Sequence, residues 1–461
     1  MQSAEFSGEY KGAALGDKQR SDRLVRIGEV LARDPALSFP EAMASEGQLE
    51  ALYRFLNNDD VTFEEIIRPH AKSTVERCRA HARVLVLHDT TPLQFDGKRT
   101  GLGRLHTTAK GFFLHASLAV TVDRAPLGII GAETLLRTAR KRAHRSHRSV
   151  RSDPKRESLR WWRGVERAEK ILGCPRHAIH VMDREGDNYD LYAQLQANSV
   201  RHVIRFAHDR NLLGQTEKLK GTALRGKCTF KREIHIAARP PALLYDQHIH
   251  PERDARDVTF EVSAIAVELV RSTIYAPGAP PSLKVNVVTA VERDCPRGCT
   301  PVCWHLVTTE PTDTRSDIAA IVDAYRARRI VEEFFKALKS GCQFEKRQLE
   351  SYRFLTNALG SFLPIAYRLL SLRNASRSDP DTPCTDLTSR QLRLLRLHSS
   401  RHMSTPPTNM EATLALAEFG GHRLRNGPPG WMVLGRALQR LLVMELGWLD
   451  RGKSRKDVID G

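Results

Sequence analysis

The chain has 461 residues, of which 41% are hydrophobic and 27% are charged. This balance is typical of globular proteins, and the length exceeds what one compact core usually holds, so we expect two or three domains. Lys and Arg number 72 against 54 Asp and Glu, and the formal charge of +18 favours a polyanionic partner such as nucleic acid. Ribosomal and membrane-surface proteins share such an excess, so the charge alone does not identify the partner.

Three protein classes are disfavoured by the sequence. The N-terminus has no basic segment followed by an apolar run, which argues against a secretory signal. The chain contains no run of about 18 apolar residues of the kind that crosses a membrane. Its eight cysteines are scattered, which argues against a disulfide framework. We therefore expect a soluble, intracellular protein with no membrane partner.

Three of the cysteines, Cys295, Cys299 and Cys303, are regularly spaced and raise the question of a zinc site. A structural zinc site needs four ligands and usually includes a Cys-x2-Cys pair, which this segment lacks. We therefore favour three separate thiols over a metal centre.

The segment up to about residue 80 has the periodicity of amphipathic helices. Its apolar residues share helix faces, formed by Leu24, Ile27, Val30 and Leu31 and then by Leu49, Leu52, Phe55 and Leu56. Basic residues lie among them, namely Lys18, Arg20, Arg23, Arg26 and Arg54. They form either an ordinary solvated face or a DNA-binding surface. We predict a helical N-terminal domain over residues 1–72.

From about residue 83 the pattern changes to short apolar runs that alternate with helical segments, as in α/β domains. We predict strands at 84–87, 112–122, 127–130, 177–182 and 202–206, a hairpin around Asp123 and Arg124, and a helix at 157–172. Residues 137–156 carry nine Lys or Arg and one Asp, which predicts a surface loop that is either disordered or in contact with phosphates. Residues 225–308 are rich in β-branched residues and prolines, which predicts an inserted β-subdomain.

The remainder of the chain is predicted to be helical. One long helix begins where Ser316 fits an N-cap and ends at Ser340, where Gly341 fits the C′ position. The polar stretch 376–385 predicts a linker, and the Leu-rich segments 391–397 and 431–449 predict packing helices. A leucine stripe is usually core, and a dimer interface is the alternative. We therefore predict a catalytic domain over 73–370 and a C-terminal domain over 371–461.

Two aspartates follow predicted strands. Asp89 ends the apolar run 83–88, and Asp183 ends the run 177–182. Open α/β folds keep their sites at such strand ends, above the edge of the sheet. Either aspartate alone is better explained as a turn residue or a helix cap, but two of them together point to a site.

The long helix contributes a third acid. Tyr325, Arg328, Glu332 and Lys339 fall on one narrow face, because their spacing follows the period of the α-helix. Arg328 and Glu332 alone would be an ordinary stabilising pair. Together with the two aspartates, Glu332 completes a set of three carboxylates with basic neighbours.

Three carboxylates brought together bind hard divalent cations. Two Mg²⁺ ions, with Mn²⁺ as a substitute, activate the attacking oxygen and stabilise the leaving oxygen in phosphodiester displacement. Basic neighbours position the phosphate and neutralise its charge. No Walker A, G-x-S-x-G, G-x-G-x-x-G or H-E-x-x-H sequence competes with this interpretation.

These motifs resemble those of the Tn-five-type transposases of the IS-four group. The resemblance is carried by AALGDKQRSDRL at 13–24, ALYRFLNN at 51–58, LHDTTPLQF at 87–95, MDREGDNYDLY at 182–192 and YRARRIVEEFFKALKSG at 325–341. The last segment contains the group's Y-x2-R-x3-E-x6-K signature. The resemblance implies a cut-and-paste DNA transposase with an RNase H-like α/β core, a β-rich insertion, and helical N- and C-terminal domains.

The resemblance also implies roles for individual residues. Asp89, Asp183 and Glu332 would be the catalytic metal ligands. The signature residues Tyr325, Arg328 and Lys339 would contact DNA phosphates. The remaining DNA contacts would come from Arg205 in the catalytic channel and from Arg23 and Arg54 at the transposon end.

Trp304 resembles a family tryptophan that assists the flipped base of a DNA hairpin intermediate, although a buried strand tryptophan is the alternative. The implied partners are double-stranded DNA, at the transposon ends and at the target, and a second copy in a homodimeric synaptic complex. The implied location is the bacterial cytoplasm, in association with the nucleoid. The β-insertion, the basic loop and the shorter C-terminal domain depart from the family pattern.

Three other functions compete with this one. An RNase H-like nuclease or resolvase would cut DNA without joining it. A transposition inhibitor or domesticated remnant would bind DNA without catalysis, but it would have no chemical reason to keep all three carboxylates and the signature. A zinc-structured RNA-binding protein would require a metal site.

Overall fold

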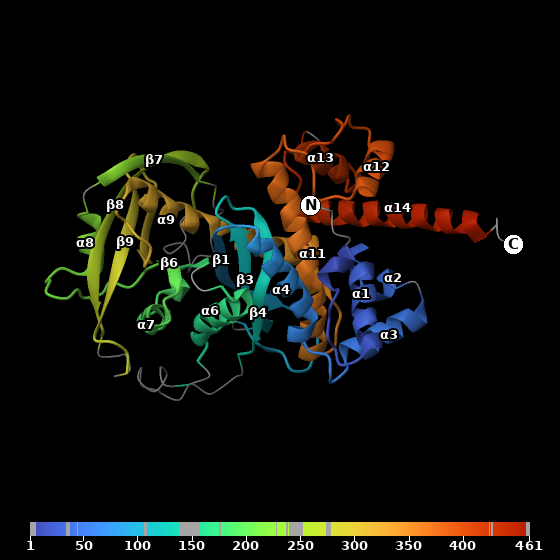
Figure 1. The fold of residues 1–461 in the computed structure, drawn as a ribbon, viewed down its shortest axis with the longest axis horizontal. Helices are drawn as coiled ribbons and strands as arrows, with labels where there is room; N and C mark the ends of the chain where they lie inside the picture. The colour runs from blue at the N-terminus through green and yellow to red at the C-terminus, as the bar shows by residue number, and fades with distance from the viewer. Residues whose placement is uncertain are drawn as a thin grey trace.

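A computed structural model describes residues 6–33, 37–43, 45–105, 108–137, 153, 156–174, 177–226, 228–236, 238, 252–272, 278–423, 425 and 427–457. A ten-stranded mixed sheet runs through the middle of the chain, and helices cover it and extend beyond it at one side (Figure 1). The strands follow the order β2-β3-β1-β5-β6-β10-β9-β8-β7, and β4 also pairs with β3. Most of the predicted basic loop at 137–156 lies outside the described residues.

The first half of the sheet contains the strands that the apolar runs predict. β1 (Val84–Gln94), β3 (Lys110–Thr121) and β4 (Pro126–Leu135) are antiparallel, with the short β2 (Gly103–Arg104) beside β3. β5 (Ala178–Met182) and β6 (Arg201–Arg205) continue the sheet in parallel with β1. Helices α6 (Leu159–Leu172) and α7 (Tyr189–Ala197) follow β4 and β5 in the chain. The predicted α/β fold with an RNase H-like core is confirmed.

The second half of the sheet corresponds to the predicted β-insertion. It consists of β7 (Cys228–Ile236), β8 (Arg256–Val270), β9 (Ser282–Glu292) and β10 (Cys303–Thr308), preceded by α8 (Leu219–Leu224). β10 pairs antiparallel with β6 through Leu306 opposite Arg205, so the insertion extends the core sheet instead of forming a sheet of its own. This pairing satisfies the edge of β6, which would otherwise expose unpaired backbone groups.

The N-terminal helices lie on the side of the molecule away from the β-insertion (Figure 1). They are η1 (Phe6–Glu9), α1 (Lys18–Arg33), α2 (Phe39–Ala42), α3 (Glu46–Leu56) and α4 (Phe63–Arg79). Side-chain caps begin α3 at Ser45 and α4 at Thr62. Within the described residues, no helix is both long and apolar enough to span a membrane.

The C-terminal helices begin with α11 (Tyr352–Ser378), followed by α12 (Ser389–His398), α13 (Asn409–Phe419) and α14 (Trp431–Asp457). The prediction of a linker from Ser376 is wrong at its start, because α11 continues to Ser378. Leu372 and Ser376 are buried, and these tertiary contacts hold the polar end of the helix in place. Helix α13 was not predicted from the sequence.

The predicted helix from Ser316 to Ser340 is divided in the structure. α9 (Arg315–Ala327) begins at a capping box formed by Thr314 and Asp317, so the predicted N-cap at Ser316 is wrong by two residues. Arg328 separates α9 from α10 (Arg329–Lys336) while keeping right-handed helical angles. A π-helical turn, η3 (Ala337–Gly341), then ends the segment before the short η4 (Phe344–Lys346). Lys339 lies within this wider turn, which departs from the uniform α-helical period on which its predicted face was based.

Gly341 does not end the helix as a left-handed C′ residue, because it lies inside the π-helical turn. A Cβ atom added at Gly341 would lie 2.8 Å from Leu369 on α11. A Cβ atom added at Gly435 on α14 would lie 2.3 Å from the Gly341 carbonyl oxygen. Gly435 is therefore required where the backbones of α14 and η3 approach closely, whereas Gly341 contacts the end of the Leu369 side chain.

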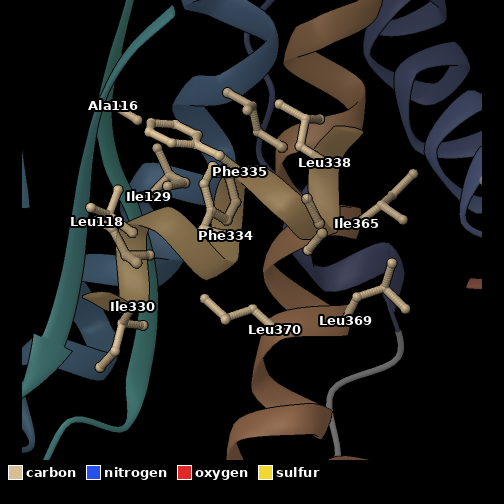
Figure 2. Packing of buried hydrophobic residues seen from close by; sticks show 14 of the residues in the cluster. Ala116, Leu118, Ile129, Ile330, Phe334, Phe335, Leu338, Ile365, Leu369 and Leu370 are labelled. Atoms are coloured by element: carbon tan, nitrogen blue, oxygen red, sulfur yellow. The ribbon is translucent and has the colours of Figure 1, made fainter. Parts of the chain in front are cut away.

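Helix α10 packs its apolar face between the sheet and α11. Figure 2 shows Phe334 and Phe335 between side chains of the sheet, such as Leu118 and Ile129, and the helix α11. Phe334 is completely buried. The polar side of α10 is thereby directed toward the middle of β1 and the end of β5.

The N-terminal segment is joined to the core by a buried polar cluster. A carboxylate oxygen of Glu9 accepts a hydrogen bond from His70 Nδ1 at 2.5 Å, and the other accepts one from Arg77 at 2.8 Å. The backbone N–H of Ile129 donates to His70 Nε2, so His70 is neutral and donates through Nδ1. Burial lowers the pKa of His70, in agreement with that assignment. Arg77 is therefore the cation that balances Glu9.

We expect Glu9→Gln to lower the free energy of unfolding by about 3 kcal/mol, because it leaves Arg77 largely buried without its charge partner. Burial raises the pKa of Glu9, but the hydrogen bond from His70 and the charge of Arg77 outweigh it and lower the pKa to about 2. The stabilisation is thus present above the ordinary pKa of 4.5 and is lost as the pH falls toward 2. Urea unfolding at several pH values measures both effects.

Glu76→Gln is the matched control, since Glu76 pairs with Arg79 on the exposed face of α4. That change should cost about 0.5 kcal/mol. Equal losses in the two variants would show that the buried cluster does not hold the N-terminal segment.

Candidate active site

Asp89 lies in the middle of β1, opposite Ala116 of β3. The prediction that it stands at the end of its strand is wrong, because pairing with β3 continues β1 as far as Gln94. The four residues from Val84 to Leu87 are buried, which holds the strand inside the sheet up to the site. The Asp89 side chain is 16% exposed, and its Oδ1 accepts a hydrogen bond from the Thr90 N–H at 2.8 Å. The carboxylate thus has one oxygen fixed and one directed to its neighbours.

Asp183 directly follows β5, the strand parallel to β1. It caps the 3₁₀ turn η2 (Arg184–Gly186), where its Oδ1 accepts a hydrogen bond from the Glu185 N–H at 2.8 Å. The predicted cap role and the predicted site position therefore coincide. The second oxygen, Oδ2, points toward Arg328.

Glu332 lies at the edge of the buried apolar face of α10, and its side chain is 47% exposed. Arg328, one turn earlier, brings the three acids together. Its guanidinium lies 2.5 Å from Glu332 Oε1, 3.5 Å from Asp183 Oδ2 and 3.6 Å from Asp89 Oδ2. Three carboxylates from distant segments of the chain therefore surround one cation.

This arrangement leaves negative charge uncompensated. Burial raises the pKa of Asp89, Arg328 lowers it, and the Asp183 and Glu332 carboxylates raise it, so that the net pKa is about 7. Burial lowers the pKa of Arg328, but the three carboxylates outweigh it and raise the pKa well above its ordinary value. Arg328 therefore stays charged while Asp89 titrates near neutral pH.

The donor set is suited to a hard divalent cation, because all three side chains offer carboxylate oxygens that one guanidinium does not neutralise. In the part of the chain that the structure describes, no three His, Cys, Asp or Glu side chains are already arranged around a metal position. Arg328 lies between the acids instead. Metal binding therefore requires the Arg328 guanidinium to withdraw from at least one carboxylate.

A cleft of about 520 Å³ opens beside the carboxylates. Its walls carry most of the residues predicted to contact DNA, together with two of the acids: Asp183, Arg205, Trp304, Tyr325, Arg328 and Glu332. Trp304 is half-buried, with its ring 4.9 Å from that of Phe260 and 5.5 Å from that of Tyr325. The Arg205 guanidinium donates to the Tyr325 hydroxyl and to the Cys303 carbonyl oxygen.

Four of the predicted site residues do not line this cleft. One is Asp89, whose carboxylate lies behind it, 3.6 Å from the Arg328 guanidinium, and the others are Lys339, Arg23 and Arg54. The Lys339 ammonium lies 3.8 Å from Glu345, and burial lowers its pKa. Arg23 and Arg54 lie on α1 and α3, where both side chains are exposed. They belong to a separate surface formed by the N-terminal helices.

The cleft also contains basic residues that the sequence analysis did not select: Arg124, Arg184, Arg253, Arg326, Arg329 and Lys336. Arg326, Arg329 and Lys336 lie near the signature, where the density of basic residues could have indicated them. Arg124 and Arg253 reach the cleft from the β3–β4 turn and from the segment before β8. No local pattern marks those two residues.

The three regularly spaced cysteines have separate contacts. Cys295 donates to the Cys299 carbonyl oxygen, and Cys303 lies 3.2 Å from His305 Nε2. Burial raises the pKa of Cys303 to about 11, and burial lowers that of His305 to about 4. Both groups are therefore neutral at ordinary pH.

Comparison with known proteins gives two family matches. A family model for a transposase DNA-binding domain matches residues 4–61, and one for a transposase DDE domain matches residues 163–363. The second range includes Asp183, Trp304 and the whole signature. Asp89 lies outside both ranges.

One solved structure with a similar arrangement is the cryo-EM structure of the piggyBac transposase synaptic complex with hairpin DNA. It shares 10% sequence identity over 80% of this chain and 69% of that chain, with a TM-score of 0.37. A likeness at this level says nothing about the residues of the site.

We expect divalent metal to bind more tightly as the pH rises through 7, because below that pH the Asp89 carboxyl holds a proton that a metal must displace. The apparent Kd for Mn²⁺ should fall about tenfold between pH 6 and pH 8. Electron paramagnetic resonance of free Mn²⁺ measures it. An affinity that is flat over this range, or unchanged by Asp89→Asn, would contradict the assignment of Asp89 as a ligand.

Proposed function

The chain is a DDE transposase with a transposase DNA-binding domain, and we propose that it cuts transposon ends and joins them to target DNA at the site formed by Asp89, Asp183 and Glu332. The observation that carries this proposal is the meeting of the three carboxylates at Arg328, beside a basic cleft. Each acid comes from a different segment. Their convergence is therefore a property of the fold and not of local sequence.

DDE transposase domains use divalent metals as a class, and the three acids here would hold Mg²⁺, or Mn²⁺ in its place, with two ions per site. Such ions activate an attacking water or 3′-hydroxyl and stabilise the leaving oxygen in phosphoryl transfer. The carboxylates supply oxygen ligands that need no proton transfer once ionised. Hydrogen bonds from Thr90 and Glu185 already hold one oxygen of each aspartate in place.

The basic residues of the cleft bind and orient the DNA. Arg328 is charged at every physiological pH and can move from the carboxylates to a phosphate when metal enters. The Tyr325 hydroxyl and the Arg205 guanidinium lie on the same wall, where they would donate to phosphate oxygens. Lys339 would reach the DNA only outside the described cleft, since it faces Glu345.

We further propose the finer assignments that the sequence resemblance implies. The chain would be of the Tn-five type, with residues 1–72 binding the transposon end through Arg23 and Arg54, 73–370 carrying catalysis, and 371–461 contributing to a homodimeric synaptic complex. It would act in the bacterial cytoplasm, in association with the nucleoid. Exposure of Arg23 and Arg54 supports the first of these roles.

We expect Asp89→Asn, Asp183→Asn and Glu332→Gln each to reduce Mg²⁺-dependent DNA cleavage by roughly a thousandfold or more, because each removes an ionised metal ligand from a site that acts as a unit. Binding of the same DNA should stay within a few-fold of the wild type. The substrate is DNA that carries the inverted repeats identified by sequencing both sides of the gene, and the readout is a gel of cleaved and strand-transfer products.

Glu333→Gln is the matched control, since Glu333 lies beside Glu332 but pairs with Lys336 and Arg373. It should leave cleavage within a few-fold. Retained cleavage in any of the three carboxylate variants would refute the proposed site. Cleavage without strand-transfer products in the wild type would indicate a nuclease that cuts without joining.

A hairpin intermediate predicts a specific defect in Trp304→Ala. If Trp304 stacks on a flipped base, loss of its ring should reduce hairpin formation at least tenfold while the first nick proceeds at the normal rate. Trp304→Phe should recover much of the activity. Equal loss of nicking and hairpin formation would instead show that Trp304 only packs against Phe260 and Tyr325.

A further inference from the structure

The backbone ladder between the two aspartate strands ends before the site. β1 and β5 pair from Val84 opposite Ala178 to Leu87 opposite Val181. Asp89 and Asp183 both lie beyond the last pair. The ladder therefore does not fix the separation of the two carboxylates, although metal binding depends on that separation.

Arg160, in the first turn of α6, spans the gap. Its Nε donates to the Thr90 hydroxyl oxygen at 2.9 Å, and its Nη2 lies 2.5 Å from Glu185 Oε2. The Arg160 side chain is 12% exposed, so most of it is held inside the protein. One guanidinium thus connects the middle of β1 to the turn after β5.

Each partner of Arg160 also holds one of the aspartates. The Thr90 N–H donates to Asp89 Oδ1, and the Glu185 N–H donates to Asp183 Oδ1, both at 2.8 Å. A continuous series of contacts therefore runs from one carboxylate through Arg160 to the other. The contacts use only the oxygens that face away from Arg328.

The Thr90 hydroxyl is oriented by its surroundings. Arg160 Nε donates to its oxygen, so its own hydrogen is available for His115 Nδ1 at 2.9 Å. Burial lowers the pKa of His115 to about 3, and the nearby Arg160 charge acts in the same direction. His115 is therefore a neutral acceptor, and the Thr90 side chain has one fixed orientation.

Helix α6 is anchored firmly enough to make Arg160 a fixed point. Trp161 is 1% exposed, and a Cβ atom added at Gly164 would lie 2.8 Å from His115 Nε2, so the helix lies directly on the sheet. Glu157, just before the helix, accepts two hydrogen bonds of 2.7 Å from Arg137. Arg156 pairs with Asp190 of α7.

We propose that Arg160 is a positioning residue that sets the spacing of the Asp89 and Asp183 carboxylates for metal binding. The inference rests on the proposed function, because it assumes that both aspartates are metal ligands. Arginine suits this role because its planar fork donates in two directions at once, whereas a lysine ammonium at the same place would hold one partner well.

The test measures Mn²⁺ binding to the full-length chain by electron paramagnetic resonance, together with thermal unfolding. Arg160→Lys should weaken Mn²⁺ binding at least tenfold while the melting temperature changes little, because residues that orient metal ligands act on affinity at this scale. Arg163→Lys is the matched control. It lies on the same helix and pairs with Glu133, away from both aspartates, and its Mn²⁺ affinity should stay within twofold of the wild type.

A second variant breaks the same connection from its exposed end. Glu185 is 63% exposed, so the Glu185→Ala variant should fold normally. It should also weaken Mn²⁺ binding, as Arg160→Lys does. In the double variant, Arg160→Lys should then have little further effect on Mn²⁺ affinity, because the contact between the two residues is already lost. The proposal would be overturned by any of three results: unchanged Mn²⁺ affinity in either single variant, equal losses of affinity in Arg160→Lys and Arg163→Lys, or additive losses in the double variant. Wild-type affinity in Asp89→Asn would instead refute the proposed metal site itself.

Discussion

Burial of the apolar face of α10 is the constraint on which the site depends. Phe334 and Phe335 are held between the sheet and α11 (Figure 2). This packing leaves the polar side of α10, which carries Glu332, toward the middle of β1 and the end of β5. The two aspartates lie just beyond the last pair of the ladder between β1 and β5, so backbone pairing brings both chain segments to the site. The third acid has no such backbone partner. The position of Glu332 therefore depends on the side-chain packing behind α10. Because close-packed interiors transmit small changes in shape, a change in that packing would move the Glu332 carboxylate.

The same packing brings together charges that repel one another. Three carboxylates share Arg328, and the pKa of Asp89 is already raised, chiefly by burial, to about 7. A chain selected only for stability would not keep this cluster, because apolar or singly charged residues would cost less to bury. Local destabilisation of this kind is common where a ligand later supplies the missing charge.

The sequence predicts elements whose cause is local. Apolar runs predict β1 and β5, and the acids that end these runs indicate the site. Features that depend on distant partners were missed: Gly341 serves contact with α11 and α14 instead of ending a helix, and Arg160 is an ordinary helix arginine until Thr90 and Glu185 are placed beside it. The extension of the core sheet by β10 was missed for the same reason, since the sequence of one strand does not reveal which strand it pairs with.

The buried cluster around Glu9 has a consequence for DNA geometry. Glu9 and Tyr10 both insert into the core, and Asn357 of α11 donates to the carbonyl oxygens of Leu56 and Val61. The N-terminal helices are thus joined to the rest of the molecule by buried contacts. A duplex held by them would present its phosphates to a catalytic centre at one angle and one distance. The number of base pairs between the recognised sequence and the cut would then be set by the distance between the N-terminal helices and the catalytic centre.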